Sequence, residues 1–240
     1  MITLYVFGPM LGLPDPSPPC MKAHALLKMA GLEYRVDHSG LRKAPKGKLP
    51  YIDDDGAIIP DSTFIRWHLE EKYRIDFDKG LSAAERAQAW AFEKLCEDNL
   101  YWAVMSVRWT EEANFTRGPA RFFDSAPAPL RPVIAKIVRR SVRKRLHAQG
   151  TGRHSQTEIE RLATHGIDAL AAQLGDKPWL MGPEPCAADA SVHATVTGLL
   201  CPTFETPLRT ATERHANLVA YSKRGMERWF KDMPRVPGGA

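Results

Sequence analysis

Short apolar runs and helix-periodic segments alternate along the first part of the chain. Residues 2–7 form an apolar run that suits a buried strand. Residues 21–30 place apolar side chains at helical spacing, and the glycine that follows favours a helix end. Residues 33–37 alternate in polarity and predict a second strand, so the chain begins with a β-α-β unit. The polar stretch 38–48 has room for an irregular helix.

A hairpin and a capped helix are predicted next. The apolar runs 49–53 and 57–59 flank an Asp-Asp-Gly sequence, and Asp-Gly between two apolar runs is typical of a hairpin. Asp61 and Ser62 are good capping residues for a helix over 63–73. The element order over residues 1–75 is that of an α/β thioredoxin-like domain with a central mixed sheet.

The pattern changes after this point, and nearly all of the remaining chain has helical periodicity. Residues 76–81 are predicted to be a linker, and residues 82–240 an all-α C-terminal domain with a frayed tail from Pro234. Capping boxes begin two helices, at Ser82 and at Ser155. The run 187–200 is apolar on every side, which predicts a buried helix. The helix predicted over 155–174 has an apolar core stripe that includes Leu162. The predicted helices cover about 82–109, 131–149, 155–174, 187–200 and 211–230.

Composition narrows the class of protein. The 240 residues are 44% hydrophobic and 25% charged with a net charge of +5, as in ordinary globular proteins and too weak a charge to indicate nucleic-acid binding. No apolar run approaches the roughly 18 residues that span a bilayer, and the first residues lack the features of a signal peptide. We therefore expect a cytoplasmic protein. Four cysteines and eight histidines show no metal-ligand spacing, so no metal is expected.

The stretch from Pro16 to Cys20 is the strongest candidate for chemistry. Ser17 suits an N-cap and Pro18 suits the first position of a helix. A hydroxyl and a thiol then lie near the positive end of the helix dipole, which favours a thiolate or another anion. A simple capping role for Ser17 is compatible with the same pattern.

Four motifs in order resemble the glutathione transferase superfamily over almost the whole chain. They are SPPCMKAHALLKMAGLEYRVD at 17–37, KGKLPYI at 46–52, DSTFI at 61–65, and WLMG followed by ADAS at 179–191. The PSPPCMK entry, the KGKLPYIDDDG loop and the HANLVAY segment at 215–221 are similar to the failed axon connections and metaxin-like branch of that superfamily.

The resemblance implies a glutathione site in the N-terminal domain. Ser17 would donate a hydrogen bond to the glutathione thiolate, Leu49 before a cis Pro50 would pair with its backbone, and Lys48 would bind its glycyl carboxylate. Asp61 and Ser62 would hold its γ-glutamyl end. Cys20 would be the second, less important thiol position, with inert packing, a nucleophile or a glutathionylation site as its possible roles.

The resemblance also implies a pocket for a small hydrophobic electrophile between the domains. Loop 8–14 and the side chains of Tyr101, Trp102 and Met105 are expected to line it, although aromatic residues at helical spacing also suit plain core. The predicted activity is a detoxifying glutathione transferase, and the resemblance is compatible with a homodimer. The alternatives are a non-catalytic glutathione transferase-like adaptor and a thiol transferase that uses Cys20.

Two further features lie in the helical region. The resemblance makes Asp189 a folding residue, and Cys186 stands where the family has a Ser or Thr cap, which predicts a compensating contact or a weaker helix start. The helix over 131–147 concentrates cations beside an apolar stripe. It suits either a solvated face over the core or contact with an anionic surface.

Overall fold

The computed structural model describes residues 1–124 and 126–234, and it has an α/β part followed by a helical part. The N-terminal elements are β1 (Ile2–Tyr5), α1 (Pro18–Met29), β2 (Tyr34–Asp37), β3 (Tyr51–Asp54), β4 (Ala57–Pro60) and α2 (Ser62–Tyr73). The helical elements are α3 (Ala83–Lys94), α4 (Tyr101–Thr110), α5 (Glu112–Arg117), α6 (Arg131–Gln149), α7 (Gln156–Leu174), α8 (Ala187–Leu199), α9 (Pro207–Glu213) and α10 (Ala216–Trp229). Among the described residues, none of the helices combines the length and the apolar character that crossing a bilayer requires.

The sheet has the mixed topology that the N-terminal pattern predicts. Its strand order is β2-β1-β3-β4, with β1 parallel to β2 and antiparallel to β3. The Asp-Asp-Gly turn joins β3 and β4 in the expected antiparallel hairpin. The polar stretch after β2 contains a short 3₁₀ helix, Gly40–Lys43.

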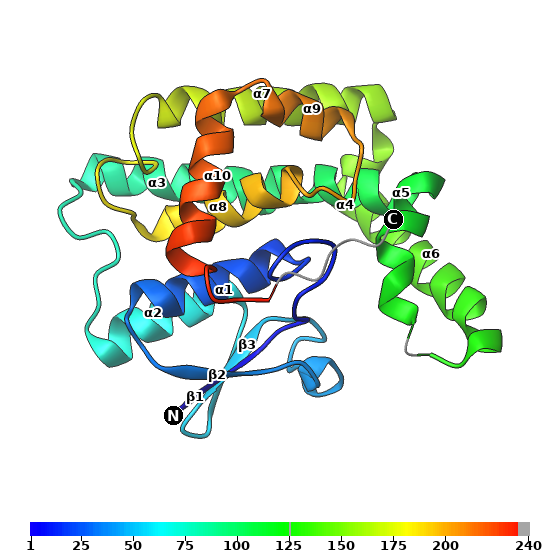
Figure 1. Cartoon of the computed structure of the whole chain (residues 1–240), viewed down its shortest axis with the longest axis horizontal. Helices are drawn as coiled ribbons and strands as arrows, with labels where there is room; N and C mark the ends of the chain where they lie inside the picture. Colours follow the sequence, from blue (N-terminus) through cyan, green and yellow to red (C-terminus); the bar gives the residue numbers. More distant parts are fainter. Residues whose placement is uncertain (125, 235–240) are drawn as a thin grey trace.

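Helices α1 and α2 lie between the sheet and the helical part (Figure 1). Leu4 of β1, Leu26 of α1 and Ile65 of α2 are completely buried, so these elements share one core. Helix α1 also packs against α8, which is buried along its whole length as predicted, its polar residues such as Asp189 and His193 included. The α1–α8 contact therefore fixes the helical part on the α/β part.

Local capping explains where the long helices begin. The Ser82 and Ser155 hydroxyls each accept a hydrogen bond from the backbone N–H of a glutamate three residues later, and the serine N–H donates to the glutamate carboxylate, as the sequence predicts. At α8 the Cys186 position is supported by two aspartates. Asp189 accepts from the Cys186 N–H at 2.9 Å, and Asp78 accepts from the Ala187 N–H at 3.0 Å. The expected compensating contact is thus present.

The structure corrects the helical pattern at three places. The predicted helix 82–109 contains a π-helical turn at Leu95–Leu100 between α3 and α4. The predicted helix 211–230 is two helices, because His215 adopts an extended conformation between α9 and α10. Leu162, assigned to the core stripe of α7, is 52% exposed. The tail from residue 235 lies outside the described residues.

Candidate functional site

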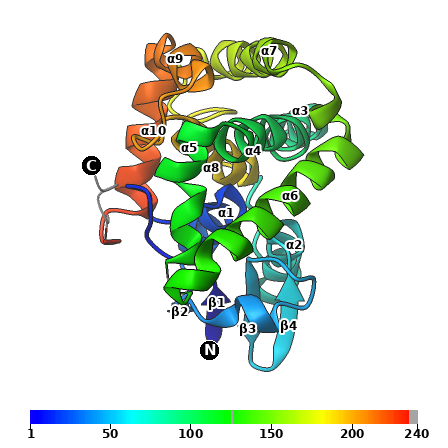
Figure 2. The ribbon, with the colours of Figure 1, turned by 90° about the vertical axis from the view of Figure 1, so that its right-hand side faces the viewer.

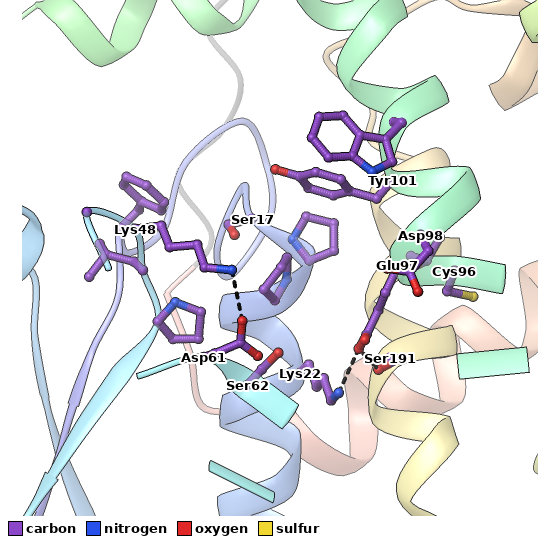
Figure 3. Close-up of a pocket in the computed structure, with 18 of the residues that line it drawn as sticks. Ser17, Lys22, Lys48, Asp61, Ser62, Cys96, Glu97, Asp98, Tyr101 and Ser191 are labelled. Carbon is purple, nitrogen blue, oxygen red and sulfur yellow. Dashed lines mark hydrogen bonds and ion pairs between the residues drawn. The ribbon is translucent and has the colours of Figure 1, made fainter. Parts of the chain in front are cut away.

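A cavity of about 480 Å³ lies between the two parts of the chain (Figure 3). Its walls come from the start of α1, the loop before β3, the start of α2, the π-helical turn, α4 and α8. Most of the residues proposed from sequence line this one space, namely Ser17, Lys48, Leu49, Pro50, Asp61, Ser62, Tyr101 and Trp102. They are separated by as many as 85 residues in sequence, so the fold brings them together.

Ser17 is the N-cap residue of α1, with φ −101° and ψ 115°. Its side chain makes no capping hydrogen bond, so the capping role does not occupy its hydroxyl. Pro18 and Pro19 take the first two helical positions and have no N–H to offer. At this end of the cavity the Ser17 hydroxyl is therefore free of a capping contact, and two N–H donors that a helix start usually offers are absent.

Two buried ionisable side chains that the sequence did not predict hold this corner. Asp15 accepts hydrogen bonds from the N–H groups of Gly8 and Ser17, both at 2.8 Å, and burial raises the pKa of its carboxyl to about 7. Arg108 of α4 donates to the carbonyls of Pro16 (3.2 Å) and Gly198 (2.6 Å). A carboxylate that accepts an N–H two residues later is a common turn, so Asp15 had a local signature. Arg108 had none.

Cys20 does not reach the cavity. It is completely buried, and burial together with the charge of Asp15 raises the pKa of its thiol well above the ordinary value. A nucleophilic cysteine needs access and thiolate character, and Cys20 has neither. The structure therefore opposes the expectation of a reactive or glutathionylated Cys20 and favours packing.

The peptide bond between Leu49 and Pro50 is cis, as the resemblance implies. The Pro50 carbonyl accepts from the N–H of Asp61 at 3.1 Å, which joins this loop to the start of α2. Within residues 1–124 and 126–234, no protein group hydrogen-bonds to the backbone of Leu49. Its N–H and carbonyl are therefore free of the sheet ladder at the edge of the cavity.

Asp61 caps α2 and also forms an ion pair. One carboxylate oxygen accepts from the Thr63 N–H at 3.0 Å, and the other lies 2.8 Å from Lys48 Nζ. Burial alone would raise the pKa of Asp61, but the Lys48 ammonium and the Thr63 N–H hold it below the ordinary value. Asp61 stays charged at neutral pH. Ser62 is 4% exposed and lines the cavity beside it.

A buried charge cluster forms the floor between the two parts (Figure 3). Lys22 of α1 is 1% exposed, and its ammonium lies 2.9 Å from Glu93 and 2.6 Å from Glu97. Glu97 also accepts from the Ser191 hydroxyl of α8 at 2.7 Å. Burial is the largest single influence and raises the pKa of Glu97, but the Lys22 charge and the hydrogen bonds from Lys22, Lys94 and Ser191 together lower it below the ordinary value. The π-helical turn places Glu97 on this floor. No pattern in the residues of that turn predicts a π-helix.

The side walls are partly aromatic. Tyr101 and Trp102 pack edge to face with ring centroids 5.3 Å apart, and the Tyr101 hydroxyl points across the cavity toward Ser17 (Figure 3). Burial raises the pKa of Tyr101, so the phenol stays protonated at neutral pH. Met105 does not line the cavity, and neither does loop 8–14. The loop instead places Leu11 and Leu13 on Cys201 and Phe204 in a separate small core.

No metal site is evident in the described residues, since they contain no group of three or more His, Cys, Asp or Glu side chains that suits an ion. The arrangement offers hydroxyl and ammonium groups for an anionic, peptide-like ligand, next to an aromatic wall.

Comparisons with known proteins point to one family. Residues 18–114 match the family model of the glutathione S-transferase N-terminal domain, and residues 163–225 match that of the C-terminal domain. Isoprene-epoxide glutathione S-transferase of Rhodococcus sp. (strain AD45) is 34% identical over 203 residues, which cover 82% of this chain and 85% of that protein.

Other relatives extend the likeness. Failed axon connections of Drosophila melanogaster is 31% identical over 98% of this chain and 60% of that protein, and human metaxin-2 is 23% identical over 88% and 82%. A solved glutathione S-transferase of Methylobacillus flagellatus KT with glutathione bound has a TM-score of 0.64 at 15% identity, covering 98% of this chain and 100% of that one. The last likeness concerns the fold, and it agrees with the mixed sheet and helical part described above.

Proposed function

The chain belongs to the glutathione S-transferase family, and from that premise we propose that it binds glutathione in the 480 Å³ cavity and joins the glutathione sulfur to a small apolar electrophile. The observation that carries the proposal is the convergence of Ser17, the Leu49–Pro50 cis peptide and the Asp61–Ser62 pair on one space. Each supplies a chemical group that a different part of glutathione requires.

Three contacts would hold the tripeptide. Asp61, which stays ionised, supplies the counter-charge for the γ-glutamyl ammonium, and the buried Ser62 hydroxyl at the start of α2 faces the adjacent carboxylate. The backbone of Leu49 has no partner in the described part of the chain and pairs with the cysteinyl unit in the manner of an added strand. Lys48 would bind the glycyl carboxylate.

Ser17 would activate the sulfur. A hydroxyl that donates to a thiolate stabilises it over the thiol by about 1 kcal/mol, which lowers the thiol pKa by roughly one unit. The helix dipole of α1 adds an effect of the same sign. Because Pro18 and Pro19 have no N–H, the hydroxyl contributes a larger share of the stabilisation than in a helix start with free backbone donors.

We propose an epoxide as the electrophile class to test first, because a relative at 34% identity bears the name of an isoprene-epoxide transferase. In that reaction the sulfur forms a bond to a ring carbon, the carbon–oxygen bond breaks, and the oxygen takes up a proton. The protonated Tyr101 hydroxyl faces the Ser17 end of the cavity, and Trp102 supplies an apolar wall. Such consumption of reactive molecules is a detoxification reaction.

A thermal shift titration with glutathione tests binding, since a ligand that binds only the folded state raises the melting temperature. We expect a rise at millimolar glutathione, and no rise would remove the proposal. The Ser17→Ala variant should keep most of this rise and lose most of its conjugation rate, about tenfold for one pKa unit of thiol activation. The Ser39→Ala variant, at an exposed loop position, is the matched control.

The same assays separate the alternatives. An unchanged rate in Ser17→Ala would clear Ser17 of the activating role. Binding without turnover of any apolar electrophile would favour a non-catalytic adaptor. Activity on mixed disulfides that disappears only in a Cys20→Ala variant would favour thiol transfer, against the burial of that thiol.

We also propose a homodimer that buries an exposed aromatic cluster on α2 and α3. Phe64, Trp67 and Trp90 are each between 40% and 47% exposed. The Trp67 ring stacks on Trp90 with centroids 6.2 Å apart and meets Phe64 edge to face at 5.2 Å. A contiguous apolar patch of this kind on a globular protein marks an interface.

A further inference from the structure

Helix α6 carries a concentrated positive charge. Its 19 residues contain seven Lys and Arg side chains and no Asp or Glu. Arg139 lies on the body of the protein, where it donates to the carbonyls of Trp109 and Thr110 and pairs with Glu112. By contrast, Arg140 and Lys144 are exposed, and within the described residues neither has a hydrogen bond or ion pair. These two charges face solvent without a partner.

The outer face of α6 also exposes large apolar side chains. Val133 is 55% exposed and Ile137 is 63% exposed, and Leu130, one turn before Val133, is 51% exposed. Most large apolar residues of the protein are buried, so two exposed ones on α6 and a third at its N-cap, Leu130, are unusual. They contrast with Val142 and Leu146, which bury the opposite side of the helix against the protein.

These apolar and cationic residues form one continuous stripe. Positions 133, 137, 140 and 144 follow the 4-3-4 spacing that keeps side chains on one side of an α-helix. We call these four residues the outer stripe of α6. The helix runs diagonally across one face of the molecule, where no other element covers it (Figure 2). The outer stripe is therefore apolar in its first half, cationic in its second half, and accessible along its length.

We propose that the outer stripe of α6 binds an anionic lipid surface, with Val133 and Ile137 entering the acyl boundary and Arg140 and Lys144 contacting the lipid phosphates. Such a surface presents negative groups above an apolar layer, so a helix docked with its N-terminal half tilted inward would place the apolar half of the stripe deeper than the cationic half. A nucleic acid would satisfy the cations but would gain little from Val133 and Ile137, because its accessible backbone is charged. The apolar half of the stripe thus selects lipid over nucleic acid.

Docking in this way would place the cavity near the membrane. Arg145, on the same helix, lines the cavity. Apolar electrophiles concentrate in lipid, so an enzyme held at its surface would meet them at a higher local concentration. The lipid contact itself does not depend on the proposed transferase activity, and a failure of either leaves the other standing.

Vesicle flotation of the full chain tests the proposal, with phosphatidylcholine vesicles that contain phosphatidylglycerol compared with vesicles of phosphatidylcholine alone. We expect binding to the anionic vesicles only, weakened by added salt. The Arg140→Gln/Lys144→Gln variant should bind roughly 30-fold more weakly, since each cation near such a surface contributes about a factor of five. The Val133→Ser/Ile137→Ser variant should lose about tenfold through the lost apolar contact.

Matched controls come from exposed positions on two other helices, α7 and α10. Leu162→Ser removes an exposed apolar side chain from α7, and Arg161→Gln/Lys223→Gln removes two exposed cations. Both controls should bind like the parent. All variants are at exposed positions, so unchanged melting temperatures show that each one is folded.

Three results would overturn the proposal. The first is absence of binding of the parent chain to anionic vesicles at low salt. The second is full retention of binding in the Val133→Ser/Ile137→Ser variant, which would reduce the contact to charge alone. The third is loss of self-association in that same variant, which would make the outer stripe an interface between two copies of this chain.

Discussion

Lys48 Nζ lies 2.8 Å from Asp61 Oδ2, so the two side chains proposed to hold opposite ends of glutathione pair with each other (Figure 3). Lys48 is 60% exposed on its side chain and Asp61 is 25% exposed. An ion pair as exposed as this contributes at most about 1 kcal/mol. Glutathione can therefore replace it at little cost, provided that each partner gains an opposite charge from the ligand.

The pair leads to a prediction about Lys48→Met. The variant should bind glutathione several-fold more weakly, because the glycyl carboxylate loses its counter-charge, yet it should bind γ-glutamylcysteine at least as tightly as the parent, because Asp61 is released for the ammonium. Isothermal titration with both ligands measures the difference. Lys79→Met, at an exposed loop position, is the control. Equal losses for the two ligands would contradict the assignment of Lys48 to the glycyl end.

Lys22→Met should destabilise the protein strongly. Lys22 is 1% exposed and pairs with Glu93, whose side chain is completely buried, and with Glu97. Removing one partner of a buried ion pair leaves uncompensated charge and costs about 3–5 kcal/mol. The control is Lys94→Met, because Lys94 contacts the same two glutamates from a position that is 25% exposed. It should lose about 1 kcal/mol or less.

Chemical denaturation of both variants gives the two free energies of unfolding. Similar values for Lys22→Met and Lys94→Met would show that the cluster is not held by Lys22. A larger loss at low salt than at high salt in Lys94→Met alone would fit its partial exposure, since screening acts on exposed charges.

A buried histidine predicts an acid-sensitive fold. His24 of α1 is 1% exposed, and burial lowers its pKa from 6.5 to about 4. Below pH 6.5 the unfolded chain binds the proton and the folded chain does not, so stability falls as the pH falls toward 4. Between about pH 7 and pH 5 this one residue should remove about 2 kcal/mol of stability.

His24→Leu tests that prediction through the change of the free energy of unfolding with pH, not through its absolute value. The variant should lose about 2 kcal/mol less than the parent between the same two pH values, about pH 7 and pH 5. Its Tyr34 partner, which lies 2.9 Å from His24 Nδ1, is partly exposed and retains access to water. Parallel pH profiles for the two proteins would mean that His24 does not titrate in this range.

The aromatic cluster of α2 and α3 predicts the oligomeric state. Trp67→Glu should convert a dimer to a monomer, because it places a charge at the centre of a patch that would be desolvated on association. Sedimentation velocity measures the two species. Leu162→Glu, an exposed apolar position on α7, should leave the dimer intact. A parent protein that sediments as a monomer at every concentration would contradict the prediction.

Local sequence determined most of the elements of this protein. The strand pattern, the Asp-Gly hairpin and the capping residues at Ser82, Ser155 and Asp61 all act within a few residues of chain, and each is found where it was predicted. Apolar residues on every side of α8 predicted its burial, and the structure buries its polar residues Asp189, His193 and Thr197 with them. The resemblance to a family added the cis peptide before Pro50.

Tertiary structure decided what each side chain faces. The break at His215 carries no glycine or proline, and its Nε2 lies 2.8 Å from Asp168 of α7, so a contact distant in sequence accompanies it. By sequence Cys20 favours packing, with a reactive role as the alternative, and the structure buries it completely. Leu162 fits the stripe of α7 by spacing, yet no neighbour covers it.

The cavity floor also separates what local sequence predicts from what tertiary packing decides. A lysine in α1 and two glutamates about 70 residues later read as solvated charges, because sequence carries no information on their distance. The π-helical turn at Leu95–Leu100 and the α1–α8 contact bring them within hydrogen-bond reach. The sequence by itself therefore determined the capping positions of Ser17 and Asp61, since local patterns need only neighbouring residues, and the family resemblance added Leu49. Which of them share one cavity, and which charges are buried beneath it, depends on packing between distant segments.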